Sequence, residues 1–562
     1  MLFFLINFYT LDIGTEFFKA AEVGLDGNPM PIKFPNNKDL MPTSIAFKTQ
    51  NNTESPLTPQ QLNSTEIKFG KSAAGILCKK ESLGFSLLPM TFGRNIAEFM
   101  TSRIVHPIQA FAIFIDHIFK KKSIQDGLLI TVPAFWTTPQ RSFITNACAI
   151  HDIPLLGIVD DTEALSQLYS ATKYSRYMKL NSSTPYRVLF IDVGSTSTKV
   201  YGFSFVWNNN QTNVTQEVTL WNEHIGGYHF KKLVSEKKGI SLKKSEKLLK
   251  TSYDRLNLSE ILSENLNDLF SLINTGINQM QSLGELNEIQ VIGGCSAYPF
   301  VMEVIRSASK NSSAVIRKEF SSTNSIAFGT VYFGLQLIDS LPYPPMYLTK
   351  TYLYNLNITI AEDHKLSERN GEILPFIREY SQGSRTITIK GDFNDLPRGT
   401  SNILQKVMLT NLTNMTFEDT DKPFGIVRIH QRTTQIESVE WCKNENKCEN
   451  IGIIDMSYDK YTYQMIAAQT SAILRVIHSR DLKMKKIEKI RSFLMDLEVV
   501  LGASKIEDGE VAKQLDAVKK LSERFEGKSL NELTDNEVNE GYELIDGLVK
   551  TMREQEKKTS KK

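Results

Sequence analysis

The sequence of 562 residues predicts a multidomain chain: a duplicated α/β domain, then a β-sandwich, then a C-terminal α-helical bundle. Three observations predict this order. Residues 1–338 contain one strand-Asp-x-Gly pattern twice, 348–457 contain short β-branched segments, and 458–556 have apolar residues at helical spacing. We expect a linker at 339–347 and a disordered basic tail at 557–562.

The α/β prediction begins with two similar segments, residues 10–15 and 190–196. Each is an apolar run that ends in Asp, followed by one apolar residue, Gly and hydroxyl residues. A strand that delivers an Asp and turns tightly at Gly brings backbone N–H groups and hydroxyls onto a phosphate, and the Asp can hold a hydrated divalent cation beside it. One such segment is common in α/β proteins. Two of them predict a nucleotide triphosphate held between two lobes.

Two strand-to-Gly-Gly turns, at 225–228 and 291–295, strengthen this prediction. At such turns the backbone passes close to another group. Any one of these glycines is as well explained by the needs of the turn itself. The prediction of nucleotide binding therefore rests on all four segments together.

The β-sandwich prediction starts after a proline-rich stretch at 340–345, where each proline fixes φ and removes a hydrogen-bond donor. The segments 352–360, 385–390 and 425–430 are short and roughly alternating, and turn residues separate them. This texture is typical of antiparallel strands.

The helical prediction rests on three apolar stripes with spacings of three and four residues, which we interpret as core-facing helix faces. The stripes are Ile487, Ile490, Leu494, Leu497 and Leu501; Val511, Leu515, Val518, Leu521 and Phe525; and Val538, Tyr542, Leu544, Ile545 and Leu548.

Composition excludes several classes of function. A net charge of +2 gives no electrostatic reason to expect a nucleic-acid partner. The apolar stretches are shorter than the roughly 20 residues that span a bilayer, so we expect no membrane insertion. Five cysteines are too few for a disulfide framework and fit no zinc spacing. Cys442 and Cys448 bracket a polar turn, and both a disulfide and two free thiols remain open there.

The compartment is indicated by two features. Residues 1–8 are apolar but lack a basic start and run into the first strand, so we expect a signal peptide to have preceded this start. The chain also has more N-x-S/T sequons than we expect by chance. They begin at Asn51, Asn63, Asn181, Asn210, Asn213, Asn257, Asn311, Asn357, Asn411 and Asn414.

The order of the motifs resembles the actin-like ATPase domain of the heat shock protein 70 (Hsp70) superfamily, a duplicated ribonuclease H-like fold. Segments 130–135, 140–141 and 158–161 fit the same order. The divergent large branch is most similar, Grp170 first and Hsp110 next. That similarity is carried by residues 12–19, 42–47, 69–74, 92–94 and 521–527.

The resemblance implies ATP or ADP and magnesium as cofactors. Its phosphate-binding positions are Gly14, Thr15 and Glu16 in a first phosphate turn, and Gly194, Ser195 and Thr196 in a second. It implies that Asp12 and Asp192 order the magnesium through water. Its other nucleotide contacts would be Gly226 and Gly227 at the phosphates or ribose, Gly293 and Gly294 beside the adenosine, and Arg255 and Ser259 at the base.

Two departures from the family pattern weaken catalysis. Pro89 stands at the position of the family's catalytic lysine, and Asp161, a remnant of the water-orienting glutamate, is one methylene shorter. Phosphoryl transfer to water needs positive charge near the γ-phosphate, and losing one preorganised donor costs on the order of 3 kcal/mol of barrier. We therefore expect at most a very slow ATPase and assign no catalytic residue.

A third departure affects the adenine site. Only about 65 residues separate Gly226-Gly227 from Gly293-Gly294, which is shorter than the family's usual span. We therefore expect low adenine affinity.

The resemblance implies a co-chaperone in the endoplasmic reticulum lumen. Its partners would be the ATPase domain of a conventional Hsp70, from which it releases ADP, and unfolded polypeptides. Two other functions remain open: a nucleotide-independent holdase and a slow autonomous foldase ATPase. A cytoplasmic location is the alternative to the lumen.

Overall fold

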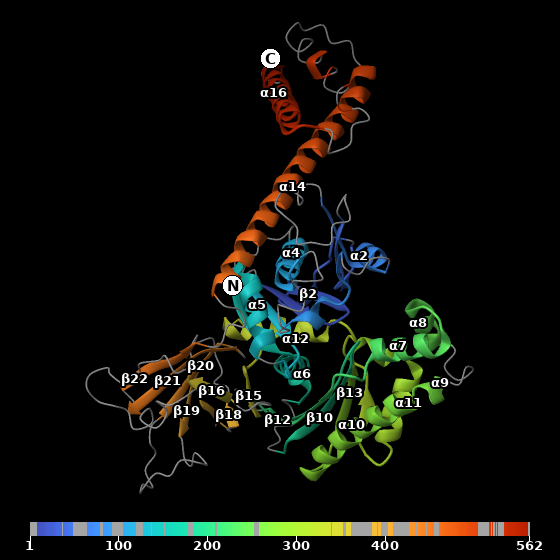
Figure 1. The fold of residues 1–562 in the computed structure, drawn as a ribbon, viewed down its shortest axis with the longest axis vertical. Coiled ribbons are helices and arrows are strands. Elements are labelled where there is room, and N and C mark those ends of the chain that lie inside the picture. Colours follow the sequence, from blue (N-terminus) through green and yellow to red (C-terminus); the bar gives the residue numbers. More distant parts are fainter. Residues whose placement is uncertain are drawn as a thin grey trace. The chain divides into compact units, whose positions relative to one another are not determined.

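The computed structural model describes residues 8–559 with gaps, of which 49–64, 361–384 and 409–425 are the longest. From 352 to 459 it describes backbone strands. Figure 1 shows the elements of the whole chain.

The described chain forms two compact units. The first consists of Met1–Pro56 and Glu66–Gln464, and the second of Leu57–Thr65 and Met465–Lys562. The first unit contains the two lobes that the repeated motifs predict.

Lobe one is built on a six-stranded sheet with the order β3-β2-β1-β8-β9, in which β4 pairs with β2. β1 runs antiparallel to β2 and parallel to β8, and β8 runs parallel to β9. The strands are β1 (Tyr9–Ile13), β2 (Phe17–Val23), β3 (Pro29–Pro31), β4 (Met41–Pro42), β8 (Leu128–Val132) and β9 (Leu155–Asp160).

A second, three-stranded sheet in lobe one has the order β6-β5-β7. Its strands are β5 (Ile45–Lys48), β6 (Glu66–Phe69) and β7 (Gly84–Phe85). The helices of this lobe are α2 (Gly70–Leu77), η2 (Leu88–Thr91), α4 (Pro107–Phe119), α5 (Thr138–Ile150), α6 (Asp161–Tyr177) and α12 (Ser325–Leu337).

Lobe two repeats the strand order of lobe one. Its seven-stranded sheet has the order β14-β13-β10-β11-β12-β15-β18. β10 runs antiparallel to β11 and parallel to β13, and β13 runs parallel to β14. The strands are β10 (Tyr186–Val193), β11 (Thr198–Trp207), β12 (Thr212–Asn222), β13 (Glu288–Ile292) and β14 (Val315–Arg317). The predicted duplication of an α/β fold is confirmed at the level of sheet topology.

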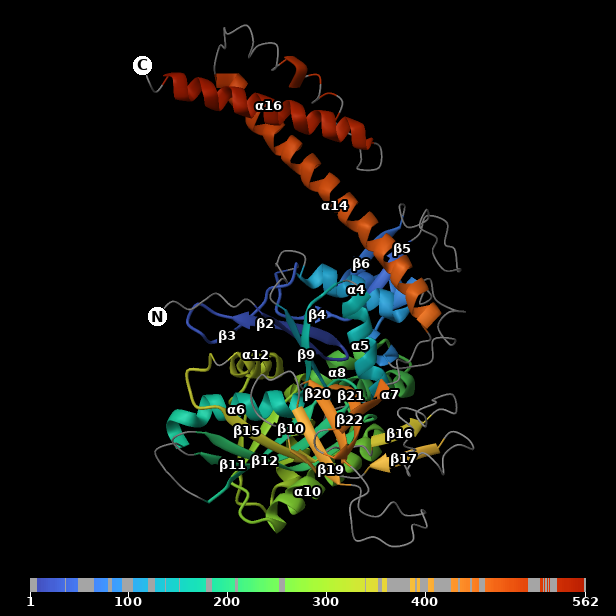
Figure 2. The same cartoon turned by 90° about the vertical axis from the view of Figure 1, so that its left-hand side faces the viewer.

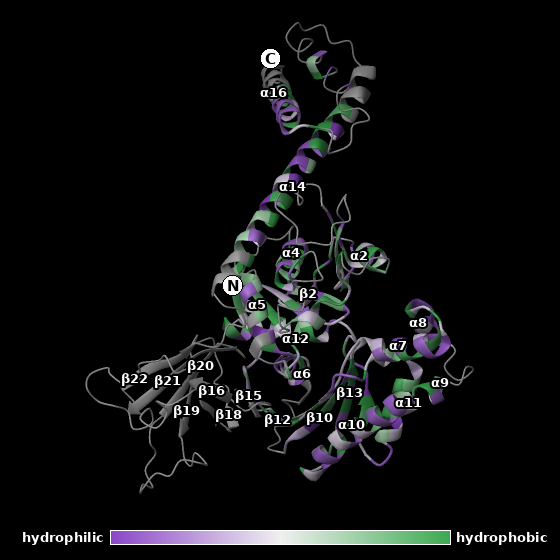
Figure 3. Cartoon of the chain, viewed as in Figure 1, coloured by the Kyte–Doolittle hydropathy of each residue, from purple (hydrophilic) through white to green (hydrophobic). Residues whose placement is uncertain are grey.

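The sheet of lobe two is buried on both faces because successive residues of β10 enter different cores. Leu189 and Ile191 pack in one core with Ile273 of α10, and Val188 and Phe190 pack on the opposite face with α6. Figure 2 shows α10 beside this sheet, and hydrophobic colour follows β10 and β13 in Figure 3. The helices of lobe two are α7 (Gly227–Lys238), α8 (Leu242–Thr251), α9 (Leu258–Ile261), α10 (Ser263–Ser282), η4 (Gly294–Ala297) and α11 (Pro299–Ala308).

The region of the predicted sandwich contains antiparallel pairs. β19 to β22 form a four-stranded sheet in that order, and β16 pairs with β17. In the same region β15 pairs with β12 of lobe two, although its residues span the predicted linker and the start of the sandwich. The sandwich and the domain boundaries therefore stay predictions. The strands are β15 (Met346–Thr351), β16 (Leu356–Ile360), β17 (Arg385–Ile389), β18 (Asp392–Asn394), β19 (Ile403–Met408), β20 (Ile426–Arg432), β21 (Gln435–Asn444) and β22 (Lys447–Ile453).

The two cysteines at the predicted polar turn face each other in backbone register, since Cys442 pairs with Cys448 across β21 and β22. The spacing of paired residues in an antiparallel ladder lies within the range that a disulfide bridges. Whether the two are bonded stays a prediction.

The second unit contains α14 (Lys460–Ala503) from Met465 onward and α16 (Asp535–Thr559). α16 begins with a capping box, in which Thr534 Oγ1 accepts from the Glu537 N–H at 3.2 Å and the Glu537 carboxylate accepts from the Thr534 N–H at 2.7 Å. Residues from all three predicted stripes share one core: Ile487, Ile490, Leu494, Val518, Phe525, Val538, Ile545 and Leu548. The predicted helix faces are thus confirmed as core-facing at these positions, and the complete bundle stays a prediction. Among the described residues, none of the helices has the length and apolar character needed to cross a membrane.

Candidate nucleotide-binding site

The two Asp-x-Gly turns, 180 residues apart in sequence, contact each other directly in the structure. We call residues 12–16 the first phosphate turn and residues 192–196 the second. The hydroxyls of Thr15 and Thr196 are hydrogen-bonded at 2.8 Å, and Ser195 Oγ donates to the Glu16 carboxylate at 2.9 Å. The structure therefore brings the predicted phosphate-binding residues of both lobes together.

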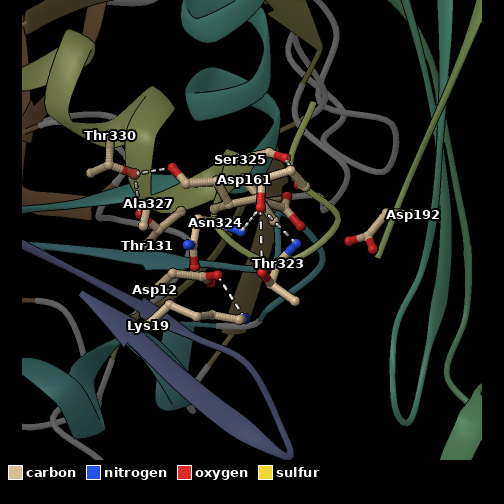
Figure 4. A network of polar contacts seen from close by, with 12 residues as sticks. Asp12, Lys19, Thr131, Asp161, Asp192, Thr323, Asn324, Ser325, Ala327 and Thr330 are labelled. Atoms are coloured by element: carbon tan, nitrogen blue, oxygen red, sulfur yellow. Dashed lines mark hydrogen bonds and ion pairs between the residues drawn. The ribbon is translucent and has the colours of Figure 1, made fainter. Parts of the chain in front are cut away.

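The first phosphate turn is held by buried hydroxyls on β1 and on neighbouring elements. Thr10 donates to the Ala327 carbonyl of α12 at 3.2 Å, and Thr131 of β8 is hydrogen-bonded to Thr330 of α12. Figure 4 shows this network next to Asp12. These contacts fix the strand that delivers Asp12.

The second phosphate turn is held by backbone contacts that need glycine at 226. The Tyr228 N–H donates to the Ser195 carbonyl at 2.6 Å, and the Gly227 N–H donates to the Gly194 carbonyl at 3.1 Å. A Cβ on Gly226 would lie 2.4 Å from the Ser195 carbonyl oxygen. The N-terminus of α7 can therefore approach this turn only because residue 226 has no side chain.

The second Gly-Gly turn also lies at the second phosphate turn. Gly293 has a φ of +86°, and a Cβ there would lie 2.4 Å from Asp192 Oδ1. A Cβ on Gly227 would meet Cys295 Sγ at 2.2 Å, so both Gly-Gly turns pack closely. Gly294 has open space where its side chain would be. The four predicted glycine segments thus include three that meet at one place, Gly194, Gly226 and Gly293.

Neither of the two predicted base contacts is confirmed. Ser259 lies exposed on α9, and the structure gives it no contact with either phosphate turn. Arg255 lies outside the described residues. Both stay predictions.

Each of the two aspartates is paired with a lysine directly across its hairpin. Asp12 faces Lys19 in the β1–β2 register, and Lys19 Nζ lies 2.8 Å from the Asp12 carboxylate. Asp192 faces Lys199 in the β10–β11 register, and their ion pair measures 2.7 Å. The two lobes therefore repeat one Asp-Lys hairpin.

Lys199 also reaches the other lobe, because its Nζ lies 2.9 Å from the Asp161 carboxylate. The Lys199 side chain is 9% exposed and that of Asp161 is 2% exposed. Burial lowers the pKa of Lys199, but the charges of Asp161 and Asp192 outweigh burial and raise this pKa above its usual value. Lys199 is therefore a buried ammonium group shared by two carboxylates from different lobes.

Both oxygens of Asp161 are occupied by protein donors. The Ala134 N–H donates to Oδ1 at 2.9 Å, and the Tyr201 hydroxyl lies 2.9 Å and 3.0 Å from the two oxygens. Burial, and then the charges of Asp161 and Asp192, raise the pKa of Tyr201 well above its usual value, so this phenol stays protonated and donates. Asp161 is thus held rigidly and engaged by three protein groups.

The remaining acidic residue, Glu16, is held by a third lysine. Lys231 of α7 lies 3.0 Å and 3.2 Å from the two Glu16 oxygens. Lys231 belongs to lobe two and Glu16 to lobe one, so this pair is a second ionic contact between the lobes.

The residues present fit a magnesium ion poorly. Magnesium requires near-octahedral oxygen ligands with its own waters, whereas Asp12 and Asp192 each have an ammonium group within 3 Å. Among the residues that the structure describes, no group of three or more His, Cys, Asp or Glu side chains is arranged to hold a metal. The expectation that Asp12 and Asp192 order magnesium stays a prediction, and these contacts argue against it.

Pro89, which the resemblance places at the position of the family's catalytic lysine, is buried at the start of the short helix η2. Proline suits the first positions of a helix, because its missing N–H would be unpaired there. It offers neither charge nor a proton to a reaction.

The sequence analysis does not identify four residues that contact the acidic side chains of the site: Lys19, Lys199, Lys231 and Tyr201. For two of them the signal is in the sequence, since each Asp-x-Gly motif has a lysine seven residues after its aspartate. In a two-stranded turn this spacing places Asp and Lys opposite each other on one face. Lys231 and Tyr201 give no such signal, because their contacts join different lobes.

Comparison with known proteins agrees with this geometry. The family model described as "Hsp70 protein" matches residues 108–264. Human "Heat shock 70 kDa protein 4L" is 21% identical over 256 residues, which is 44% of this chain and 29% of that protein.

Two further relatives match different extents of the chain. Zebrafish (Danio rerio) "Hypoxia up-regulated protein 1" is 19% identical over 440 residues, 63% of this chain and 42% of that protein. "Heat shock protein 88" of Dictyostelium discoideum is 33% identical over 82 residues, 15% of this chain and 10% of that protein. The chain spans less than half of the length of these curated relatives.

Hsp70-family proteins in general bind ATP or ADP with magnesium, and the family domain implies an actin-like ATPase fold. The duplicated sheets and the contact between the two phosphate turns agree with that fold. The chain thus contains an Hsp70-family domain, and its relatives include chaperones of the Hsp110 and Grp170 type.

Proposed function

We propose that this chain is an Hsp70-type co-chaperone that binds ATP but hydrolyses it very slowly or not at all. It accelerates ADP release from a conventional Hsp70 and holds unfolded polypeptides through residues 348–556. The observation that carries this proposal is the state of Asp161. Because Lys199, Tyr201 and Ala134 already engage both of its oxygens and its side chain is 2% exposed, Asp161 is poorly placed to orient an attacking water.

The catalytic part is tested by single-turnover ATP hydrolysis with the wild-type chain and with Pro89→Lys. We expect no hydrolysis above background in either, since the added lysine restores charge but leaves Asp161 engaged. Rapid turnover by the wild-type chain would contradict the proposal and favour the autonomous foldase.

The exchange part is tested by ADP release from a conventional Hsp70, with and without this chain. Gly194→Arg places a bulky cation in the second phosphate turn. A Cβ built on Gly194 would by itself lie 3.0 Å from the Ser197 carbonyl oxygen. We expect Gly194→Arg to abolish ATP binding and exchange together. Gly75→Arg is the matched control, because open space surrounds that exposed helical position. Unchanged exchange by Gly194→Arg would show that nucleotide does not set the active conformation.

A nucleotide-independent holdase is the second candidate. The Thr15–Thr196 hydrogen bond favours it, because the two hydroxyls that would face a phosphate are directed at each other. Prevention of client aggregation with neither ATP binding nor accelerated ADP release would select this function.

We place the protein in the endoplasmic reticulum lumen, supported by the similarity to "Hypoxia up-regulated protein 1". Of the sequon asparagines, Asn213 and Asn311 lie at exposed positions. A mobility shift of the native protein after glycosidase treatment tests this location. An unglycosylated cytosolic pool would favour the cytoplasmic alternative.

A further inference from the structure

The paired Asp-Lys hairpins put fixed positive charge where an Hsp70-type site would use a metal ion. We propose that Lys19 and Lys199 replace the divalent cation, so that this site binds a nucleotide triphosphate without magnesium. The inference rests on the nucleotide-binding part of the proposed function and names the chemical form in which the ligand is taken.

The first step of the argument is the position of Lys199. Its Nζ lies 2.7 Å from Asp192 and 2.9 Å from Asp161, so one cation bridges carboxylates of both lobes. A bridging divalent ion would have to displace this ammonium group. Displacement would leave a buried lysine without a counter-charge, which is strongly unfavourable.

The second step is the position of Lys19. A Cβ built on Gly14 would lie 2.5 Å from Lys19 Nζ, so the ammonium group covers the glycine of the first phosphate turn. An ammonium group has three N–H donors, and among the described residues the Lys19 ammonium contacts Asp12 alone. Two donors therefore remain for phosphate oxygens at the turn. The Lys19 side chain, 15% exposed, is also the more accessible of the two.

The third step is the charge of the site. Asp12, Asp192, Asp161 and Glu16 would repel a triphosphate if they were unneutralised. Lys19, Lys199 and Lys231 supply three ammonium groups against these four carboxylates. The three lysines thus cancel most of this repulsion without a metal ion.

The decisive experiment measures binding of a fluorescent ATP analogue, N-methylanthraniloyl-ATP, to the wild-type chain in excess magnesium and in excess EDTA. We expect the two dissociation constants to agree within about threefold. Tighter binding in magnesium by more than this factor would overturn the inference and leave the proposed nucleotide binding intact. Absence of binding in both buffers would contradict nucleotide binding itself.

Variants locate the effect. Lys19→Met frees the Asp12 carboxylate, and Lys199→Met frees those of Asp192 and Asp161. We expect binding by each variant to become at least about tenfold tighter in magnesium than in EDTA. Lys250→Met is the matched control, since Lys250 forms an exposed pair with Glu246 on α8, and its binding should stay indifferent to magnesium. If Lys199→Met does not fold, the more exposed Lys19→Met carries the test. Indifference of both folded variants would contradict the assigned role.

Discussion

The Asp-Lys hairpins of the two lobes share a strand order and a motif, yet their lysines make different contacts. Lys19 contacts only Asp12 among the described residues, so its ion pair stays inside lobe one. Lys199 contacts Asp192 in its own hairpin and Asp161 in lobe one. The comparison teaches that a duplicated motif can keep its local geometry while one copy gains an ionic bridge between the lobes.

The largest loss of stability should follow from removing that ionic bridge. Lys199→Met leaves Asp161 and Asp192 buried without their counter-charge, and we expect a loss of about 3–5 kcal/mol in the free energy of unfolding of the first unit. Urea denaturation of the full chain measures it, with Lys250→Met as the control. A loss below that of Lys19→Met would contradict the difference drawn between the hairpins.

Acid should destabilise lobe one through His106, whose ring is buried at the start of α4. Burial lowers the pKa of His106 to about 4. The unfolded chain takes up the proton near pH 6.5, so stability is present above that pH and falls as the pH drops toward 4. The contribution is at most about 3 kcal/mol. Carboxylates also titrate in this pH range. The measurement therefore compares the pH dependence of the urea midpoint of the wild-type chain with that of the His106→Asn variant. This variant keeps an acceptor for the Ile108 N–H, and an unchanged pH slope would contradict the assignment.

Removing the local lysine should have a smaller effect. Lys19→Met loses one charge-assisted hydrogen bond at a partly exposed site, and we expect a cost of about 2 kcal/mol. The same urea experiment measures it. The pair Lys19→Met and Lys199→Met should be additive within about 0.5 kcal/mol, since the described contacts of the two lysines share no partner. A large coupling energy would show that the hairpins act as one network.

The smallest effect concerns the hydroxyl contact between the turns. Thr15→Val and Thr196→Val each remove the hydrogen bond that joins the first and second phosphate turns. A double-mutant cycle should give a coupling energy of about 1 kcal/mol or less. A coupling energy of zero would show that the hydroxyls do not hold the lobes together.

The strands and turns could be predicted from sequence because they depend on local patterns, and the repetition of the motif predicts that the two turns face each other. The apolar run, Asp and Gly at 10–15 and 190–196 set strand, turn and hydroxyl in one short segment. The ionic bridge between the lobes could not be predicted, because Lys199, Asp161 and Tyr201 meet only after two sheets have folded and packed. The resemblance predicts a loss of charge at Pro89, but nothing in the sequence predicts that three donors engage Asp161.

The pairing of β15 with β12 has a mechanical consequence. Hydrogen-bonded neighbours run without interruption from β10, which contains Asp192 near its end, through β11, β12 and β15 to β18. A change of twist at the end of β10 would thus be passed sideways from strand to strand. β15 and β18 would then rotate with the sheet of lobe two, so that motion at the nucleotide end would reach the first strands of the proposed client-binding region.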